Sequence, residues 1–109
     1  MRTDDQSLQT IVDLLKQEFK PSRLFLFGSR VGGTPASESD YDFVIVVPKY
    51  SGDRMATWQR CNELIRKKCG VLADVFIYSE REFGKLREEF SSIPETAVNT
   101  GREIDLGSF

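Results

Sequence analysis

The chain has 109 residues, of which 39% are hydrophobic and 29% are charged, values typical of one folded globular domain. Fifteen Lys and Arg against seventeen Asp and Glu give a net charge of −2, which argues against nucleic-acid binding through bulk positive charge. The sequence has no histidine, so histidine metal ligands and histidine general bases are excluded. The longest apolar run, residues 43–47, is far shorter than the roughly 20 residues of a membrane span.

Hydrophobic periodicity predicts three elements in the first half of the chain. Apolar residues at spacings of three and four indicate an amphipathic helix over about 4–19, which Pro21 ends. Residues 24–27 and 41–47 are apolar runs typical of buried strands. Residues 28–40 are rich in Ser, Thr and Gly, which predicts a loop through most of their length.

Capping residues mark the helices of the second half. We expect a helix over 53–68, a strand over 71–78, and helices that begin near 79 and run over 92–101. The tail, 102–109, is expected to add a short edge strand or to remain irregular. The element order predicts an α/β (α+β) fold: a small mixed β-sheet flanked by helices, with residues 1–109 forming a single domain.

Two apolar stripes are predicted to pack into the core. The stripe of the helix at 53–68 consists of Met55, Trp58, Ile65 and Cys69, and that of the helix after residue 79 consists of Phe83, Leu86 and Phe90. Cys61 and Cys69 are interpreted as packing residues. Their helical separation of about 12 Å is too long for a disulfide.

The most informative chemistry is the pair Asp40 and Asp42 at the start of a predicted strand. Residues two apart on a strand point to the same face, so these carboxylates would lie side by side. Like charges at such a distance repel, and a divalent cation between them relieves the repulsion; Mg²⁺ prefers such oxygen ligands. The alternative is that Asp40 caps a turn and Asp42 is a solvated strand end.

Asp74 lies inside a predicted apolar strand, where an unpaired carboxylate is costly. It therefore needs a metal, a water-filled cleft or a salt bridge to Lys or Arg. If the second and third strands are neighbours, Asp74 can converge with Asp40 and Asp42 on one metal site.

Gly28, Ser29 and Arg30 follow the first predicted strand directly. Gly28 allows close backbone approach to a ligand, Ser29 offers a hydroxyl and an N–H to a phosphate oxygen, and Arg30 can meet phosphate charge. A polar surface turn is the alternative. Ten residues separate Gly28-Ser29 from Asp40, and the spacing between two buried strands strengthens the functional interpretation.

Together these residues resemble the nucleotidyltransferase superfamily of the DNA polymerase β type. The Gly28-Ser29-Arg30 segment, the motif at 39–43 and the lone Asp74 are similar to the minimal nucleotidyltransferases, the MntA-like antitoxin subunits. The resemblance spans roughly residues 8–100 and implies a polymerase β-like palm fold. It implies that Asp40, Asp42 and Asp74 are catalytic and bind Mg²⁺, with Asp74 as ligand or base. It also implies that Gly28 and Ser29 hold the nucleotide triphosphate.

Without an apolar run of membrane-span length or a signal-peptide pattern at its start, the sequence indicates a cytoplasmic protein. The resemblance further implies an enzyme that transfers AMP from ATP to a hydroxyl. The implied acceptor is a tyrosine of a helical HEPN toxin, and the chain would be the antitoxin of that pair. Two alternatives stay open: a non-catalytic subunit that neutralises its partner by binding, and the catalytic subunit of a two-subunit enzyme that modifies a small molecule. Direct nucleic-acid or membrane binding is not expected, and homo-oligomerisation is left open.

Overall fold

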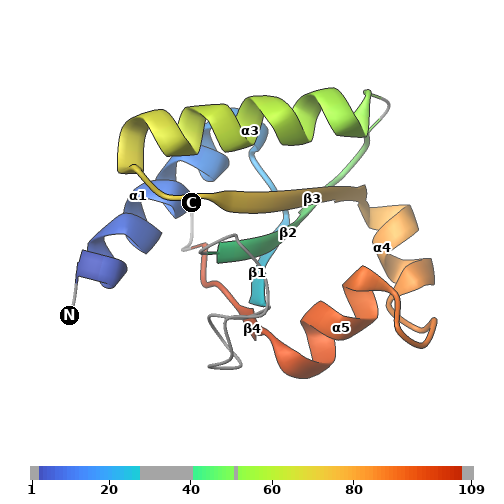
Figure 1. The fold of residues 1–109 in the computed structure, drawn as a ribbon. Coiled ribbons are helices and arrows are strands. Elements are labelled where there is room, and N and C mark those ends of the chain that lie inside the picture. Colours follow the sequence, from blue (N-terminus) through green and yellow to red (C-terminus); the bar gives the residue numbers. More distant parts are fainter. Residues whose placement is uncertain (1–2, 28–40, 51, 107–109) are drawn as a thin grey trace.

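The computed structural model describes residues 3–27, 41–50 and 52–106 (Figure 1). The predicted loop over 28–40, and with it Gly28, Ser29, Arg30 and Asp40, lies outside the described residues. The elements in chain order are α1 (Thr3–Phe19), β1 (Arg23–Phe27), β2 (Tyr41–Val47), α3 (Arg54–Cys69), β3 (Ala73–Ser79), α4 (Glu80–Leu86), α5 (Ile93–Thr100) and β4 (Arg102–Glu103).

The four strands form one mixed sheet in the order β3-β2-β1-β4. β1 pairs antiparallel with both β2 and β4, whereas β2 and β3 are parallel. β2 is therefore a central strand, and β3 and β4 are the edges. The prediction of a small mixed sheet with helices around it is confirmed, and so is the short edge strand in the C-terminal tail.

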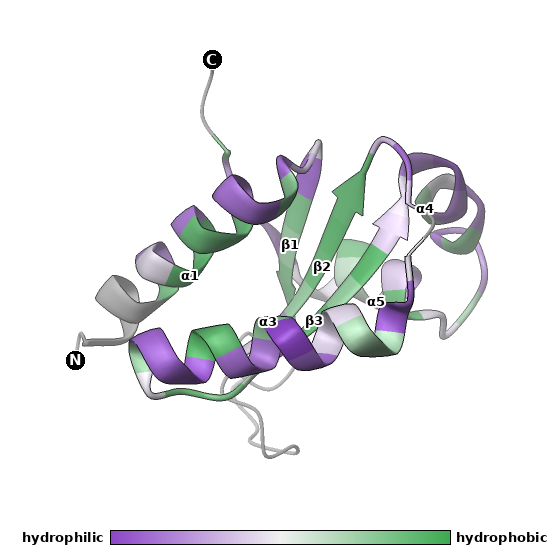
Figure 2. Cartoon of the chain, turned by 90° about the horizontal axis from the view of Figure 1, so that it is seen from above, coloured by the Kyte–Doolittle hydropathy of each residue, from purple (hydrophilic) through white to green (hydrophobic). Residues whose placement is uncertain are grey.

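α1 and α3 lie on one side of this sheet and α4 and α5 on the other (Figure 1), and a hydrophobic core lies on each face. α1 and α3 cover one face through Ile11, Leu15, Cys61 and Ile65, which pack against alternate residues of β1, β2 and β3. α4 and α5 cover part of the other face with the buried side chains of Phe83 and Ala97. Figure 2 shows the consequence in hydropathy: hydrophobic residues dominate β1 and β2, while hydrophilic ones alternate with them along α1 and α3.

Local signals placed the helix boundaries well. The Asp53 carboxylate accepts from the backbone N–H groups of Met55 and Ala56 and begins α3, and Gly70 ends it in the left-handed conformation at φ 73°. Ser79 and Glu82 form a complete capping box at the start of α4, and the Ser92 hydroxyl accepts from the Glu95 N–H at the start of α5.

Two predicted core residues are exposed instead. Met55 is 62% exposed because it lies in the first turn of α3, whose buried residues are Cys61 and Ile65. Phe90 is 91% exposed because α4 ends at Leu86, so the helical spacing from Phe83 no longer applies there. The core assignment was wrong for both residues, whereas Phe83 is buried as expected.

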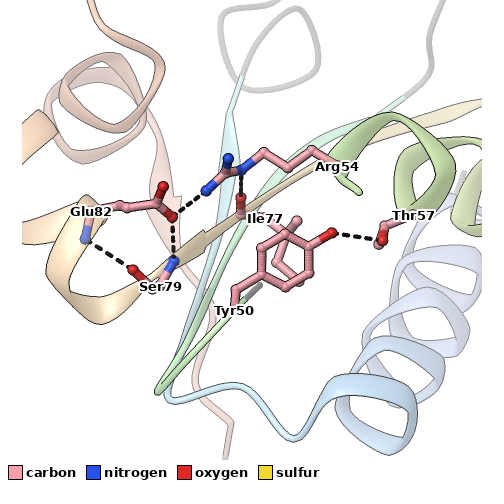
Figure 3. A network of polar contacts seen from close by, with 6 residues as sticks. All are labelled: Tyr50, Arg54, Thr57, Ile77, Ser79 and Glu82. Atoms are coloured by element: carbon pink, nitrogen blue, oxygen red, sulfur yellow. Dashed lines mark hydrogen bonds and ion pairs between the residues drawn. The ribbon is translucent and has the colours of Figure 1, made fainter. Parts of the chain in front are cut away.

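A polar network fixes the start of α3 against the end of β3 (Figure 3). The Arg54 Nε donates to the Ile77 carbonyl oxygen at 3.0 Å, and its guanidinium also forms an ion pair with Glu82. Tyr50 adds a 2.8 Å hydrogen bond to Thr57 one turn into the helix. These contacts set the position of α3 along β3. None of the helices in the described ranges is long and apolar enough to cross a membrane.

Candidate active site

Asp42 and Asp74 lie directly opposite each other on neighbouring parallel strands. Residues paired in register on parallel strands point to the same face, and the strands lie about 4.8 Å apart. The two carboxylates therefore leave the sheet side by side, each half-buried. The condition set by the sequence, that the second and third strands be neighbours, is met.

The acid pair lies on the face that α4 and α5 cover, at the end of the sheet where β2 and β3 begin. Val44 and Val46, which follow Asp42 at even spacing, pack under these helices. Phe27, the register partner of Asp42, and Phe76, two residues after Asp74, belong to or pack against this core, and their ring centroids lie 6.1 Å apart. Apolar side chains thus lie on one side of the carboxylates, which lowers the local dielectric and strengthens their attraction for a cation.

The partner that the structure gives Asp74 is the indole of Trp58. The Trp58 Nε1 donates to the Asp74 Oδ1 at 3.0 Å. Trp58 was expected to be a core residue, but it is half-buried and its polar edge is used. Among the described residues, the ion pairs between Arg and carboxylate side chains do not include Asp74, so the salt-bridge alternative is not supported.

Sequence reasoning missed this role of Trp58. A signal was present: a lone acid in an apolar strand needs a donor, and a buried tryptophan usually finds an acceptor for its N–H. The two residues are 16 apart in the sequence. Only the packing of α3 along β3 brings them together.

Four predicted site residues, Gly28, Ser29, Arg30 and Asp40, lie outside the described residues. Their assignments stay predictions. The topology is compatible with them, because Phe27, the last residue of β1, is paired with Asp42. The chain thus leaves β1 directly beside Asp42, on the strand next to β2.

The chemistry of the described pair fits a magnesium ion. Mg²⁺ binds oxygen ligands and is commonly held by one or two carboxylates together with substrate phosphates. Within the described ranges, no group of three or more His, Cys, Asp or Glu side chains is placed to hold a metal. Asp42 and Asp74 would therefore act with Asp40 or with ligand oxygens.

The two cysteines are separate from this site. Cys61 is buried in the α3 core, where desolvation raises the pKa of its thiol to about 11, and Cys69 is a second free cysteine. A thiol with so high a pKa is protonated at neutral pH and a poor nucleophile. Its role is packing, as predicted.

Comparison with known proteins agrees with this geometry. The family model described as "Polymerase beta, Nucleotidyltransferase" matches residues 9–92, most of the chain. The chain belongs to the polymerase β nucleotidyltransferase family. The matched range includes both strands of the acid pair and the helix that contributes Trp58.

A solved structure shows that the fold is shared. A chain in a crystal structure of a mutant MntA–HpeT toxin–antitoxin complex superposes with a TM-score of 0.64 at 20% sequence identity. The match covers 89% of this chain and 70% of that one. No curated protein sequence matches the chain.

Proposed function

We propose that this nucleotidyltransferase-family chain is a Mg²⁺-dependent enzyme that transfers AMP from ATP to a hydroxyl group. The observation that supports it is the in-register pair of Asp42 and Asp74 on neighbouring parallel strands. Two adjacent carboxylates on one face of a sheet suit a divalent cation, which takes oxygen ligands of this kind. Asp40, two residues before Asp42, is proposed as the third acid.

Each predicted residue has a role in this reaction. Gly28 and Ser29 would bind the triphosphate through backbone and hydroxyl groups, and Arg30 would meet its charge. Asp40 and Asp42 would hold Mg²⁺, which supplies charge neutralisation at the phosphoryl oxygens and lowers the pKa of the attacking hydroxyl. Asp74 would complete this acid set or accept the proton of that hydroxyl. The α-phosphate is attacked in line, and pyrophosphate leaves.

We further propose that the acceptor is a tyrosine of a helical HEPN-type partner and that the chain is an antitoxin. One finding supports a protein partner: a chain of similar fold was solved within a toxin–antitoxin complex. We treat residues 1–109 as a single domain acting in the cytoplasm, where ATP is available and free cysteines such as Cys61 and Cys69 persist.

A binding experiment tests the metal–nucleotide site. We expect ATP with Mg²⁺ to bind the wild-type chain in a calorimetric titration, and Asp42→Asn to weaken that binding at least tenfold, because the variant loses a ligand charge. Asp13→Asn is the matched control, since it removes the same charge from an exposed position on α1. Equal affinity of the wild type and Asp42→Asn would refute the assignment.

A further inference from the structure

The hydrogen bond between Trp58 and Asp74 connects the two sides of the edge strand β3. Asp74 points to the face covered by α4 and α5, whereas α3 packs on the opposite face through Cys61 and Ile65. Because β3 is an edge of the sheet, no further strand of the described residues separates the indole from the carboxylate. Trp58 therefore reaches around the outside of β3 to contact the candidate site.

The position of the indole is fixed from the start of α3. Arg54 lies four residues before Trp58, on the same side of the helix, and its Nε donates to the Ile77 carbonyl oxygen (Figure 3). Arg54 thus contacts β3 at Ile77 while Trp58 contacts it at Asp74, so the helix runs antiparallel along the strand. Two polar contacts one helical turn apart hold α3 in a defined register with β3.

The chemistry of the donor matters for a cation site. An indole N–H is neutral, so it satisfies one carboxylate oxygen without cancelling the negative charge that attracts a metal. A lysine or arginine at the same place would neutralise that charge and compete with the cation. The hydrogen bond occupies Oδ1 of Asp74. Because the indole ring is rigid, this bond also orients the carboxylate and so the direction in which its second oxygen points.

We propose that Trp58 is a positioning residue that orients the Asp74 carboxylate for cation binding beside Asp42. This inference rests on the proposed metal site. Donors that orient metal-ligating side chains typically change metal affinity by 10- to 100-fold when removed. Trp58 contacts Asp74 and is assigned no contact with substrate.

Mn²⁺, which takes the same oxygen ligands as Mg²⁺, is a direct probe. Binding is followed by the loss of the free Mn²⁺ signal in electron paramagnetic resonance, a readout that does not depend on activity. We expect Trp58→Phe, which keeps an aromatic ring but lacks the N–H, to weaken Mn²⁺ binding about tenfold. Met55→Ala is the matched control: Met55 lines the same groove along β3 as Trp58, and its removal is expected to leave Mn²⁺ affinity unchanged.

A double-variant cycle separates positioning from general loosening of the fold. Within an Asp74→Asn background, Trp58→Phe is expected to cause no further loss of Mn²⁺ affinity, because its only route to the metal has been removed. If Trp58→Phe lowered Mn²⁺ affinity by the same factor in the wild-type and in the Asp74→Asn background, the proposal would be overturned. Thermal unfolding of every variant verifies that it is folded under the conditions of the titration.

The sole tryptophan of the chain gives a second readout in the wild type. Paramagnetic Mn²⁺ bound beside Asp74 is expected to quench Trp58 emission, and Asp42→Asn is expected to abolish this quenching. Wild-type Mn²⁺ binding with an unchanged affinity in Trp58→Phe would overturn the role of Trp58 alone. No Mn²⁺ binding by the wild type would refute the metal site itself.

Discussion

At the scale of single residues, the neutral partner of Asp74 decides what its removal should do. A buried carboxylate paired with Lys or Arg leaves an uncompensated charge when it is deleted, at a cost of about 3–5 kcal/mol. Here the partner is the Trp58 indole, and the nearest aligned residue is another acid, Asp42. Deletion removes one hydrogen bond and one repulsion, two effects that oppose each other.

The free energy of unfolding of Asp74→Ala without metal is therefore expected to lie within about 1 kcal/mol of the wild-type value, because a typical hydrogen bond contributes about 1 kcal/mol net. Its nucleotidyl transfer with Mg²⁺ is expected to be nearly abolished. Denaturant unfolding in a chelator measures the first effect, and transfer from labelled ATP measures the second. A loss of several kcal/mol with retained activity would remove Asp74 from the site.

The pattern of residue types predicted Asp40 and Asp42 as a pair, with Asp74 joining them only if the second and third strands were neighbours, which the sequence alone could not decide. The contact of Trp58 with Asp74 could not be predicted from the sequence for the same reason. Helical periodicity shows which side of α3 is apolar, but not which strand lies beside it. Asp40, Gly28, Ser29 and Arg30 stay predictions from their motif and spacing.

At the scale of secondary structure, helix starts were predictable because capping is local. Asp53, Ser79 and Ser92 each accept from a backbone N–H two or three residues ahead. Helix ends were harder where no such signal exists. α4 ends at Leu86 without a glycine cap, so its apolar stripe wrongly extended to Phe90.

The capping box of α4 gives a pH-dependent prediction. The pKa of the Glu82 carboxyl lies below its ordinary value, chiefly because it accepts a hydrogen bond from the Ser79 backbone N–H and secondly because it accepts one from Arg54. A carboxyl whose pKa is lower in the folded state stabilises above its unfolded pKa, and this contribution disappears as the pH falls through the folded pKa. Glu82→Gln should therefore destabilise the chain at pH 7, and the difference from the wild type should shrink steadily below about pH 4.3.

Thermal unfolding of both proteins across this pH range measures the difference. Glu80→Gln is the control, because Glu80 lies in the same first turn but is not the residue that closes the capping box. A difference between Glu82→Gln and the wild type that persists unchanged at pH 3 would show that the carboxylate charge is not responsible.

Two glycines of the second half should respond to alanine in opposite directions. A Cβ at Gly101 would lie 2.6 Å from the carbonyl oxygens of Ala97 and Leu26, so the backbone must shift, whereas a Cβ at Gly84 meets nothing within 4 Å. Gly84→Ala inside α4 should stabilise by about 0.5–1 kcal/mol. Gly101→Ala should destabilise by about 1–3 kcal/mol, as overpacking does. Denaturant unfolding provides both values, and equal signs would contradict the packing at Gly101.

At the scale of the whole molecule, the element order predicted the fold class correctly. The predicted order was a helix, a strand, a long loop and a second strand, followed by a helix, a strand and two helices. It corresponds to the observed mixed sheet with helices on both faces. The sheet order β3-β2-β1-β4 was not contained in that pattern, because it depends on long-range pairing. This order places the two acids together at one end of the sheet and leaves β3 at the edge that Trp58 crosses.

Transfer of labelled AMP to a partner protein is the direct test of the proposed Mg²⁺-dependent nucleotidyl transfer. The purified chain is incubated with Mg²⁺, ATP labelled in its α-phosphate, and a helical HEPN-type protein as the proposed partner. We expect label on the partner and release of pyrophosphate with the wild type and with Asp13→Asn, and no label with Asp42→Asn. Label transferred equally well by Asp42→Asn would contradict the proposal, as would a partner neutralised by the wild-type chain without any transfer of label.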